Sequence, residues 1–549
     1  MGEEELRWLM VVVVVFVVGL SLVMGMKMVE LLWWRPRRLE EHFSKQGIRG
    51  PPYRFFLGNV KEMVGFMLEA SSKPMMPHNS HNVLPRVLSF YHHWKKIYGS
   101  TFLLWFGPTP RLTVSDPDLI REILVSRSDA FDRYESHPLV RQLEGDGLVS
   151  LRGEKWAHHR KVLTPTFHMD NLKLLIPYIG KTVLEMLEDK MKVAKSSSSS
   201  SSSEVEEIEI DVSEWFHTVT EDTITRTAFG QSYDDGRAVC HLQAQQMTFA
   251  AEAFRKVLIP GYRFLPTKRN ASSWRLDKEI KKNLVGLIRK RKESNSLEEE
   301  EMRRRKKVED DDDGDDGKQD ENYCKDLLGQ MIKASTPANE IVEECKTFFF
   351  AGKQTTSNLL TWTTVLLAMH PEWQDLARHE VLRFCGSRGI PPSRDHLAKL
   401  KTLGMIINET LRLYPPAVAT IRKAKVDVEL RGYKIPQGTE ILIPIMAVHH
   451  DAKIWGPDAA EFNPARFMDK ARSPTGFIPF GVGPRMCIGK NLALLEAKLT
   501  IAILLQRFRF SLAPRYVHAP TVLMLLYPQY GAPVIFKPLS PSIQSDGPH

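Results

Sequence analysis

The stretch from Phe480 to Gly489 (FGVGPRMCIG) constrains this chain most, because it sets one cysteine, Cys487, between glycines. Gly483 and Gly489 let the backbone turn with no side chain in the way. Arg485 can pair with an anionic group, and backbone N–H groups around the sulfur can tune its electron donation. The pattern suits a thiolate that approaches a flat cofactor closely. The alternative is a buried structural cysteine in a glycine-rich loop.

Composition narrows the class of protein. The chain has 549 residues and is 43% hydrophobic, enough for a large core, and length alone allows about two to four domains. Its five cysteines are odd in number and unclustered, which favours a reducing compartment over a disulfide framework. The net charge of +9 is compatible with nucleic acid, an anionic membrane or an acidic protein partner. No nucleic-acid-binding motif is visible, so we expect no nucleic acid partner.

The N-terminus predicts a membrane anchor. The segment Trp8–Met26 carries no charge over 19 residues and, as a helix, spans roughly 28 Å, close to the hydrocarbon thickness of a bilayer. A signal peptide is the competing interpretation, but its apolar region is normally shorter and its N-terminal side basic. Here Glu3, Glu4 and Glu5 precede the run, and the basic residues follow it. We therefore expect an uncleaved single-pass anchor with a cytosolic C-terminal side.

Three parts are expected along the chain: an anchor at 1–34, a basic and proline-rich hinge at 35–52, and one large domain at 53–549. The consecutive prolines of the hinge cannot continue a helix, and they stiffen the connector. An ordinary turn is the simpler interpretation of the same residues.

Two low-complexity segments are expected to be loop insertions in the large domain. One lies near 195–204 and contains eight consecutive serines. The other, near 294–322, alternates acidic and basic blocks of a kind that is usually disordered. Its basic cluster could also be a nuclear address, but acidic neighbours and a membrane anchor disfavour this.

Hydrophobic periodicity predicts a mainly α fold with small β-sheets. Amphipathic helices are expected at 171–192, 275–293, 339–369 and 371–385, and short strands at 101–106, 110–115 and 440–444.

The spacing Phe-x-x-Gly-x-Arg-x-Cys-x-Gly resembles the haem-binding loop of the cytochrome P450 superfamily, with all five fixed positions present. The resemblance spans about residue 50 to the C-terminus. It implies the cytochrome P450 fold behind one transmembrane helix, with haem b (iron protoporphyrin IX) as cofactor. Cys487 would be the axial ligand of the iron, and a proximal thiolate favours O–O cleavage. Phe480, Arg485 and Gly489 would contact the cofactor.

A second motif pairs an acid with a base three residues apart, at Glu409 and Arg412. Alone, it would be an exposed and weak pair on one helix face. Together with the downstream stretch FNPARF at 462–467 it resembles the Glu-x-x-Arg and Pro-x-Arg-Phe signature of cytochromes P450. The resemblance implies a buried charge triad of Glu409, Arg412 and Arg466 that fixes the loop behind the haem.

Trp156 and Arg160 stand four residues apart, so both can reach one haem propionate from the same helix face. The motif alone is equally typical of a surface turn. Its place far upstream of the cysteine loop matches the family. Arg422 matches a position where many family members hold another propionate partner.

The stretch FFFAGKQTTS at 348–357 places glycine and hydroxyl residues inside an apolar helix, where they can open a small groove. It resembles the oxygen-activation segment of cytochromes P450, which implies catalytic roles for Ala351, Gly352, Gln354 and Thr355. Thr355 would relay protons. The family usually has an acid where this chain has Gln354, and glutamine can hold a water but carries no charge.

The resemblance implies a monooxygenase that hydroxylates an apolar substrate with O2 and NADPH-derived electrons. No flavin or NADPH motif is present, so the electrons would come from a separate NADPH–cytochrome P450 reductase at the endoplasmic reticulum membrane. Arg485 and Lys490 lie on the expected docking side and suit an acidic partner. Propionate pairing or solvation are their alternative roles.

The substrate pocket is expected to be apolar and lined by six residues: Phe349, Phe350, Val418, Ala419, Val522 and Leu523. Three stretches, at 351–364, 447–450 and 518–528, resemble the plant brassinosteroid C-26 hydroxylases, which inactivate that hormone. Hydroxylation of fatty acids or other terpenoids is the main alternative. A haem-thiolate isomerase is a further one, although it needs no proton-relaying threonine, and a membrane protein with a degenerate haem loop is the weakest.

Overall fold

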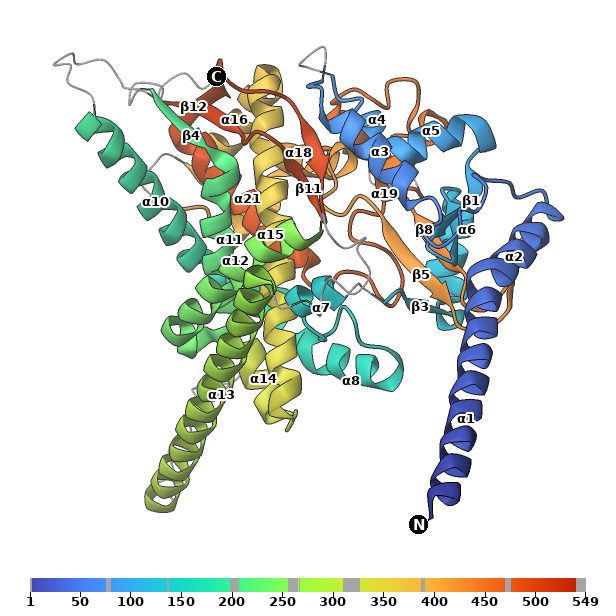
Figure 1. Ribbon diagram of the computed structural model, residues 1–549. Helices are drawn as coiled ribbons and strands as arrows, with labels where there is room; N and C mark the ends of the chain where they lie inside the picture. The colour runs from blue at the N-terminus through green and yellow to red at the C-terminus, as the bar shows by residue number, and fades with distance from the viewer. Residues whose placement is uncertain are drawn as a thin grey trace.

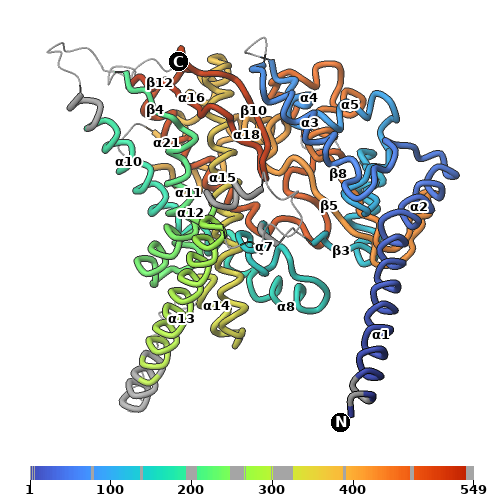
Figure 2. The backbone as a smooth tube through the Cα atoms, in the orientation of Figure 1, coloured from blue at the N-terminus to red at the C-terminus, as the bar shows by residue number. Residues whose placement is uncertain are grey.

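The computed structural model describes residues 2–75, 80–135, 138–197, 207–254, 265, 267–309, 326–386, 391–469 and 475–539. It is a mostly helical molecule with its largest sheet at one side, close to the N-terminal helix (Figure 1). Helix α15 (Ala338–Met369) runs through the middle of the helical part, between α11 (Val212–Phe229) and α18 (Lys401–Leu413) (Figure 2). The mainly α class with small β-sheets that is expected from the sequence is confirmed.

The remaining α-helices are α1 (Glu3–Val29), α2 (Arg35–Ser44), α3 (Val60–Ser71), α4 (Leu84–Val87), α5 (Ser89–Tyr98), α6 (Pro117–Arg121), α7 (Pro138–Glu144), α8 (Gly153–Leu163), α9 (Met169–Leu172), α10 (Ile176–Ser197), α12 (Tyr233–Phe254), α13 (Lys268–Glu309), α14 (Leu327–Lys333), α16 (Pro371–Cys385), α17 (Arg394–Lys399), α19 (Ile445–His449), α20 (Ala452–Trp455) and α21 (Lys490–Arg507).

The largest sheet has the strand order β1-β2-β8-β5-β3, in which only the β2–β8 pair is parallel. A second sheet has the order β4-β12-β9, and two hairpins pair β10 with β11 and β6 with β7. The strands are β1 (Thr101–Phe106), β2 (Thr109–Val114), β3 (Phe131–Arg133), β4 (Ile208–Asp211), β5 (Thr420–Ala424), β6 (Val428–Leu430), β7 (Tyr433–Ile435), β8 (Glu440–Ile443), β9 (Phe508–Leu512), β10 (Pro520–Val522), β11 (Leu526–Pro528) and β12 (Pro533–Pro538).

The crossing of α11 and α15 depends on a glycine. A Cβ on Gly352 would lie 2.5 Å from Cγ1 of Ile224, so any side chain there would force the two helices apart. Both helices are buried along most of their length around this point. Gly352 was predicted to open a groove in the helix. Its observed effect is to let α11 and α15 pack closely together.

Most predicted elements are present with small shifts. The helices expected at 339–369 and 371–385 match α15 and α16, and the strand at 101–106 matches β1. The helix expected at 171–192 is divided, because α9 gives way to a short 3-10 turn before α10 begins at Ile176. Pro177 explains the restart, since proline has no N–H to donate and fits only the first turn of a helix.

The second low-complexity segment is helical as far as the structure describes it. Helix α13 continues to Glu309, so residues 294–309 are not the loop that was expected at 294–322. Glutamate, lysine and arginine are strong helix formers, and blocks of opposite charge allow pairs at i and i+4. Residues 310–322, and residues 198–204 of the serine segment, lie outside the described part of the chain.

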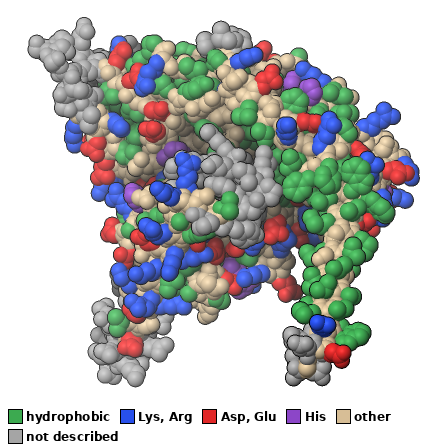
Figure 3. Space-filling view, viewed as in Figure 1, with side chains coloured by type: hydrophobic (Ala, Val, Ile, Leu, Met, Phe, Trp, Pro, Cys, Tyr) green, Lys and Arg blue, Asp and Glu red, His purple; other side chains and the backbone are tan. Residues whose placement is uncertain are grey.

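The N-terminal helix stands clear of the molecule. Residues 7–44 form one continuous helical stretch, α1, a π turn (Glu30–Trp34) and α2, whose apolar part is long enough to cross a membrane and is entirely unburied. Hydrophobic side chains cover α1 and continue at its base (Figure 3), where Trp34 and Phe55 are exposed. This is compatible with the predicted anchor.

The predicted hinge is not a free connector. Its first part is helix α2, and Phe43 and Ile48 are buried in one core cluster with Leu103 and Trp105. The carbonyl of Arg49 accepts a hydrogen bond from the Leu103 N–H at 3.0 Å. The expected boundary at residue 53 therefore falls inside a packed segment.

Two truncations test this division. Removing residues 2–29 should leave the melting temperature in detergent unchanged within about 1 °C, because α1 packs on nothing in the domain. Removing residues 2–52 should lower it clearly, because Phe43 and Ile48 each lose burial worth about 1.5–3 kcal/mol. Equal melting temperatures for the two truncations would show that residues 35–52 are a loose linker.

Candidate active site

A cavity of about 330 Å³ lies beside the middle of α15 and is closed on the other side by the loop that carries Cys487. Its walls come from α8, α11, α15, β5 and the start of α21, segments far apart in the sequence. Of the predicted cofactor residues, all seven line it: Trp156, Arg160, Arg422, Phe480, Arg485, Cys487 and Gly489.

The cysteine loop is folded tightly around the thiol. The N–H of Cys487 donates to the carbonyl of Phe480 at 2.9 Å. Gly483 has a φ of +78°, and a Cβ there would lie 2.1 Å from the carbonyl oxygen of Leu124, so only glycine fits. Gly489, at the start of α21, has a φ of −83°, which any residue can adopt. The prediction that this glycine is needed to turn the backbone is therefore wrong.

The thiol of Cys487 is accessible because it opens into the cavity, although it lies deep in the molecule. Burial raises its pKa, while hydrogen bonding from the Gly489 backbone and the charge of Arg160 oppose the rise. Among the described residues, no group of three or more His, Cys, Asp or Glu side chains could hold a metal ion. A metal at this site would therefore depend on Cys487 and on ligands that a cofactor supplies.

One end of the cavity is strongly cationic. Arg160 donates to the carbonyl of Met486 at 2.9 Å, and Arg485 donates to the carbonyl of Leu151 at 2.9 Å while its guanidinium lies 4.4 Å from the Trp156 ring. Arg133 of β3 also lines the cavity. No motif predicts Arg133 as a site residue, because its place depends on pairing opposite Arg422 in the sheet.

These arginines fit the carboxylates of haem b. Burial, followed by the charges of Arg133 and Arg485, lowers the pKa of Arg422 to about 9, which is the mark of a buried cation without its counter-ion. Two propionates would supply that charge, and the apolar walls beyond would hold the macrocycle. When bound through a cysteine thiolate, haem supplies the activation of O2, and the protein supplies orientation and exclusion of water.

Helix α15 presents Ala351, Gly352 and Thr355 to the cavity, as predicted. The hydroxyl of Thr355 donates to the Ala351 carbonyl at 2.7 Å, and the hydroxyl of Thr220 from α11 lies 2.9 Å from the Lys353 carbonyl. Each of these carbonyls accepts an additional hydrogen bond from a hydroxyl group. The helix nevertheless stays continuous from Ala338 to Met369.

Gln354 is placed differently from the prediction. Its amide points away from the cavity, toward the sulfur of Met247 on α12 at 3.7 Å, and it is not one of the residues that line the cavity. It follows that Gln354 does not stand in for the usual acid next to Thr355.

Five of the six predicted pocket residues do not line this cavity. Phe349 is buried in the core, and Phe348 faces the cavity instead, stacked on Phe167 at 5.3 Å. The reason is helical phase, since residues 348, 352, 355 and 359 share one face of α15. Ala419 is confirmed in the wall, whereas four further residues are not in it: Phe350, Val418, Val522 and Leu523.

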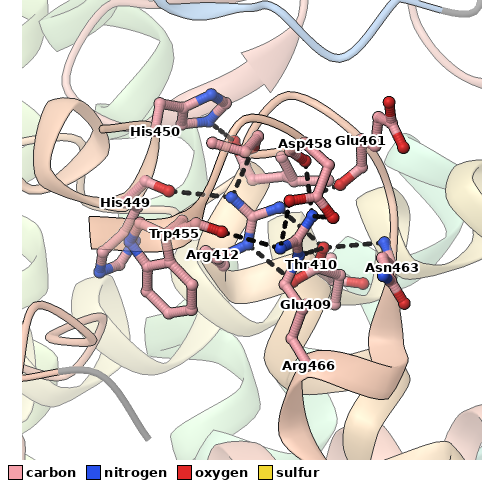
Figure 4. Close-up of polar contacts among 12 residues, drawn as sticks. Glu409, Thr410, Arg412, His449, His450, Trp455, Asp458, Glu461, Asn463 and Arg466 are labelled. Carbon is pink, nitrogen blue, oxygen red and sulfur yellow. Dashed lines mark hydrogen bonds and ion pairs between the residues drawn. The ribbon is translucent and has the colours of Figure 1, made fainter. Parts of the chain in front are cut away.

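The predicted charge triad is present and buried (Figure 4). Arg412 and Glu409 are both fully inaccessible and form two hydrogen bonds of 2.7 Å, in a bidentate pair. Arg466 lies 3.5 Å from Glu409, and the N–H of Asn463 donates to the same carboxylate at 2.9 Å. Arg412 also donates to the Ala459 carbonyl at 2.7 Å, so the pair fixes the chain between α20 and Arg466.

One residue connects this triad to the cysteine loop. Arg412 donates to the carbonyl of His449 at 2.9 Å, and the ring Nε2 of His449 accepts the N–H of Ile478 at 3.0 Å. Burial holds the pKa of His449 at about 3, so the ring is neutral and can accept. Ile478 lines the cavity two residues before Phe480. His449 was not predicted as a site residue, because its partner lies 29 positions away in an irregular segment.

A second clamp holds the helix that carries Trp156 and Arg160. His159, which lies between Trp156 and Arg160 in the sequence, is buried. Its two ring nitrogens lie 2.6 Å from Glu344 and 2.8 Å from Glu340, both on α15. Bonding to Glu344, together with that to Glu340, raises the pKa of His159. The face of α8 that carries Trp156 and Arg160, which would hold the propionates, is thereby fixed to the helix that carries Thr355.

Comparison with known proteins agrees with this geometry. The chain matches the cytochrome P450 family over residues 79–532. It is 65% identical over 539 residues to cytochrome P450 734A6 of Oryza sativa subsp. japonica, covering 94% of each chain. It is 64% identical over 546 residues to cytochrome P450 734A1 of Arabidopsis thaliana, covering 98% of this chain and 99% of the relative. Cytochrome P450 72A397 of Kalopanax septemlobus is 41% identical over 520 residues, covering 93% and 95%.

Replacing Arg412 tests the triad. Arg412→Ala should destabilise the fold by about 3–5 kcal/mol, because it leaves the Glu409 carboxylate buried without its partner. Thermal unfolding is the measurement, with Arg431→Ala as control, since Arg431 forms an exposed ion pair with Asp118. Equal melting temperatures for the two variants would contradict a buried, unscreened pair.

Replacing His449 tests the connection to the cysteine loop. His449→Leu keeps the Glu409–Arg412 pair but removes the acceptor of the Ile478 N–H, so haem should dissociate faster than from the natural protein. The rate of haem transfer to apomyoglobin measures this. An unchanged rate with a lowered melting temperature would mean that His449 only stabilises the core.

Proposed function

Because this chain belongs to the cytochrome P450 family of haem-thiolate monooxygenases, we propose that its substrate is a brassinosteroid, which it hydroxylates at C-26 and so inactivates. The observation that carries this proposal is the stretch at 351–364, which resembles the brassinosteroid C-26 hydroxylases and begins in the wall of the cavity. The stretches at 447–450 and 518–528 support it in the same way.

The lining of the cavity supports an apolar ligand. Its lining includes the apolar residues Phe348, Leu359, Ala417, Ala419 and Ile445. A steroid side chain buried there would be held by apolar contacts and kept from water, which orients one C–H bond toward the cofactor. The hydroxyl of Thr355 lies in the same wall and can accept and return a proton there.

Electrons come from a separate reductase. We propose that the NADPH–cytochrome P450 reductase docks on the face behind Cys487, where Lys490 is half-buried near Phe480. Arg485 was the other docking candidate. Its contacts with Leu151 and Trp156 inside the cavity support the cofactor role instead.

We place the protein in the endoplasmic reticulum membrane, spanning it once, with the large domain in the cytosol. The unburied apolar helix α1 supports this, as do the basic residues Arg35, Arg37 and Arg38 that follow it. The exposed Trp34 and Phe55 at its base are side chains typical of the membrane interface.

Product analysis tests the substrate. Microsomes containing this protein and a reductase receive NADPH and, separately, castasterone or a long-chain fatty acid. We expect castasterone to gain one oxygen on its side chain, in a reaction that needs NADPH and is absent in Cys487→Ala. Oxidation of the fatty acid alone would refute the hormone assignment and favour the fatty-acid hydroxylase. Rearrangement of a peroxide without NADPH would favour the isomerase.

A further inference from the structure

The clamp at His159 holds one proton more than a neutral ring would. Its Nδ1 lies 2.6 Å from Oε1 of Glu344, and its Nε2 lies 2.8 Å from Oε2 of Glu340. The other oxygen of Glu344 accepts the N–H of Leu148 at 2.9 Å. The other oxygen of Glu340 lies 2.8 Å from Nζ of Lys155. Two hydrogen bonds to the ring need two protons, whereas a neutral ring between two carboxylates supplies one. Because imidazole is more basic than a carboxylate, the second proton resides on the ring, as imidazolium.

Two walls of the cavity meet at this cluster. One is α8, from which Trp156 and Arg160 line the cavity. The other is the loop after α7, where Leu148 lines the cavity and donates its N–H to Glu344. A Cβ on Gly147 would lie 2.5 Å from the Glu344 carboxylate, so the loop approaches this closely because it has glycine there. Both walls are therefore fixed to α15 through the same buried carboxylate.

The charged groups around His159 come from three helices. The acidic ones are the two glutamates of α15. The basic ones on α8 itself are Lys155, which pairs with Glu340, and His158, whose ring centroid lies 6.0 Å away. Helix α14 also packs on α8, and its one charged residue, Lys333, forms no ion pair with His159 among the described residues. The ring of His159 is thus the cation that balances the inner, fully buried glutamate.

We propose that the imidazolium of His159 is a positioning residue that holds α8 and the loop at Leu148 against α15, so that loss of its proton at alkaline pH loosens both walls and speeds the release of haem. Once the proton has passed to solvent, one ring nitrogen presents a lone pair to a carboxylate. The buried Glu344 then has no cation beside it, which favours opening of the cluster to water. The inference concerns retention of the cofactor and does not depend on the identity of the substrate.

The electrostatics agree with this role. Bonding to Glu344 raises the pKa of His159 above its ordinary value of 6.5, and bonding to Glu340 adds to the rise, against the opposing effect of burial. The folded chain therefore binds this proton more tightly than the unfolded chain does. Its contribution to stability is complete below about pH 6.5 and is lost as the pH rises through the raised pKa of the folded state.

Haem transfer from the full chain in detergent to apomyoglobin, measured from about pH 6 to 10, tests the proposal. The natural protein should lose haem slowly at neutral pH and faster above one alkaline step. His159→Gln should lose haem about tenfold faster at pH 7 and show no step, because glutamine does not titrate and cannot donate to both carboxylates. His158→Gln is the matched control. His158 is exposed on the same helix, so this variant should keep the natural profile and its step.

A second variant separates the proton from packing. Glu340→Gln leaves His159 in place but removes one of its two carboxylates, so the step should move to lower pH. Hydrogen–deuterium exchange at pH 7 reports on the loop wall, and the Leu148 N–H should exchange faster in His159→Gln than in His158→Gln.

Three results would overturn the proposal: no alkaline step in the natural protein, the natural step in His159→Gln, or equal exchange of Leu148 in the two histidine variants. If His159→Gln does not fold, Glu340→Gln decides the question. A step that stays at the natural pH in Glu340→Gln then refutes the role of the His159 proton, and a step that moves to lower pH supports it.

Discussion

The geometry of the active site depends on a bidentate ion pair that water does not reach. Glu409 and Arg412 are fully buried, and two charges in such a place are tolerated only when their remaining hydrogen-bonding atoms are satisfied. Arg412 meets this demand by binding carbonyls of the segment from His449 to Glu461. His449 then accepts the N–H of Ile478, where the cysteine loop begins. The position of the thiol is thus coupled to a charge pair on a helix far from it in sequence.

The cavity that results is electrostatically polarised. Four arginines line it, one each from α8, β3, β5 and the cysteine loop, and their mutual repulsion prepares this part of the cavity for an anionic cofactor. Glu496 of α21 also lines the cavity, and burial raises the pKa of its carboxyl group to about 8. Most of the other lining side chains are apolar, and electrostatic interactions are stronger in such surroundings than in water.

Sequence reasoning succeeded where spacing alone fixes geometry. The cysteine loop, the Glu409–Arg412 pair and the Trp156–Arg160 pair are local in sequence, so their residues were correctly grouped. Sequence reasoning failed where the direction of a side chain depends on tertiary packing. Three consecutive phenylalanines do not reveal which one faces inward, and the contact of Gly352 with Ile224 sets that phase. Arg133 and Glu496 reach the cavity only through tertiary packing. Charged residues 294–309 were mistaken for a loop because their composition suits both solvent exposure and a helix.

The most direct test of this account is the carbon monoxide difference spectrum of the purified, reduced protein. The account predicts the carbonyl band of a thiolate-bound haem in the natural protein. Cys487→Ala should lose that band and still retain haem, because the arginine end of the cavity is intact in that variant. A thiolate-type band that persists in Cys487→Ala, or that is absent from natural protein loaded with haem, would contradict the assignment of Cys487 as the ligand around which the site is built.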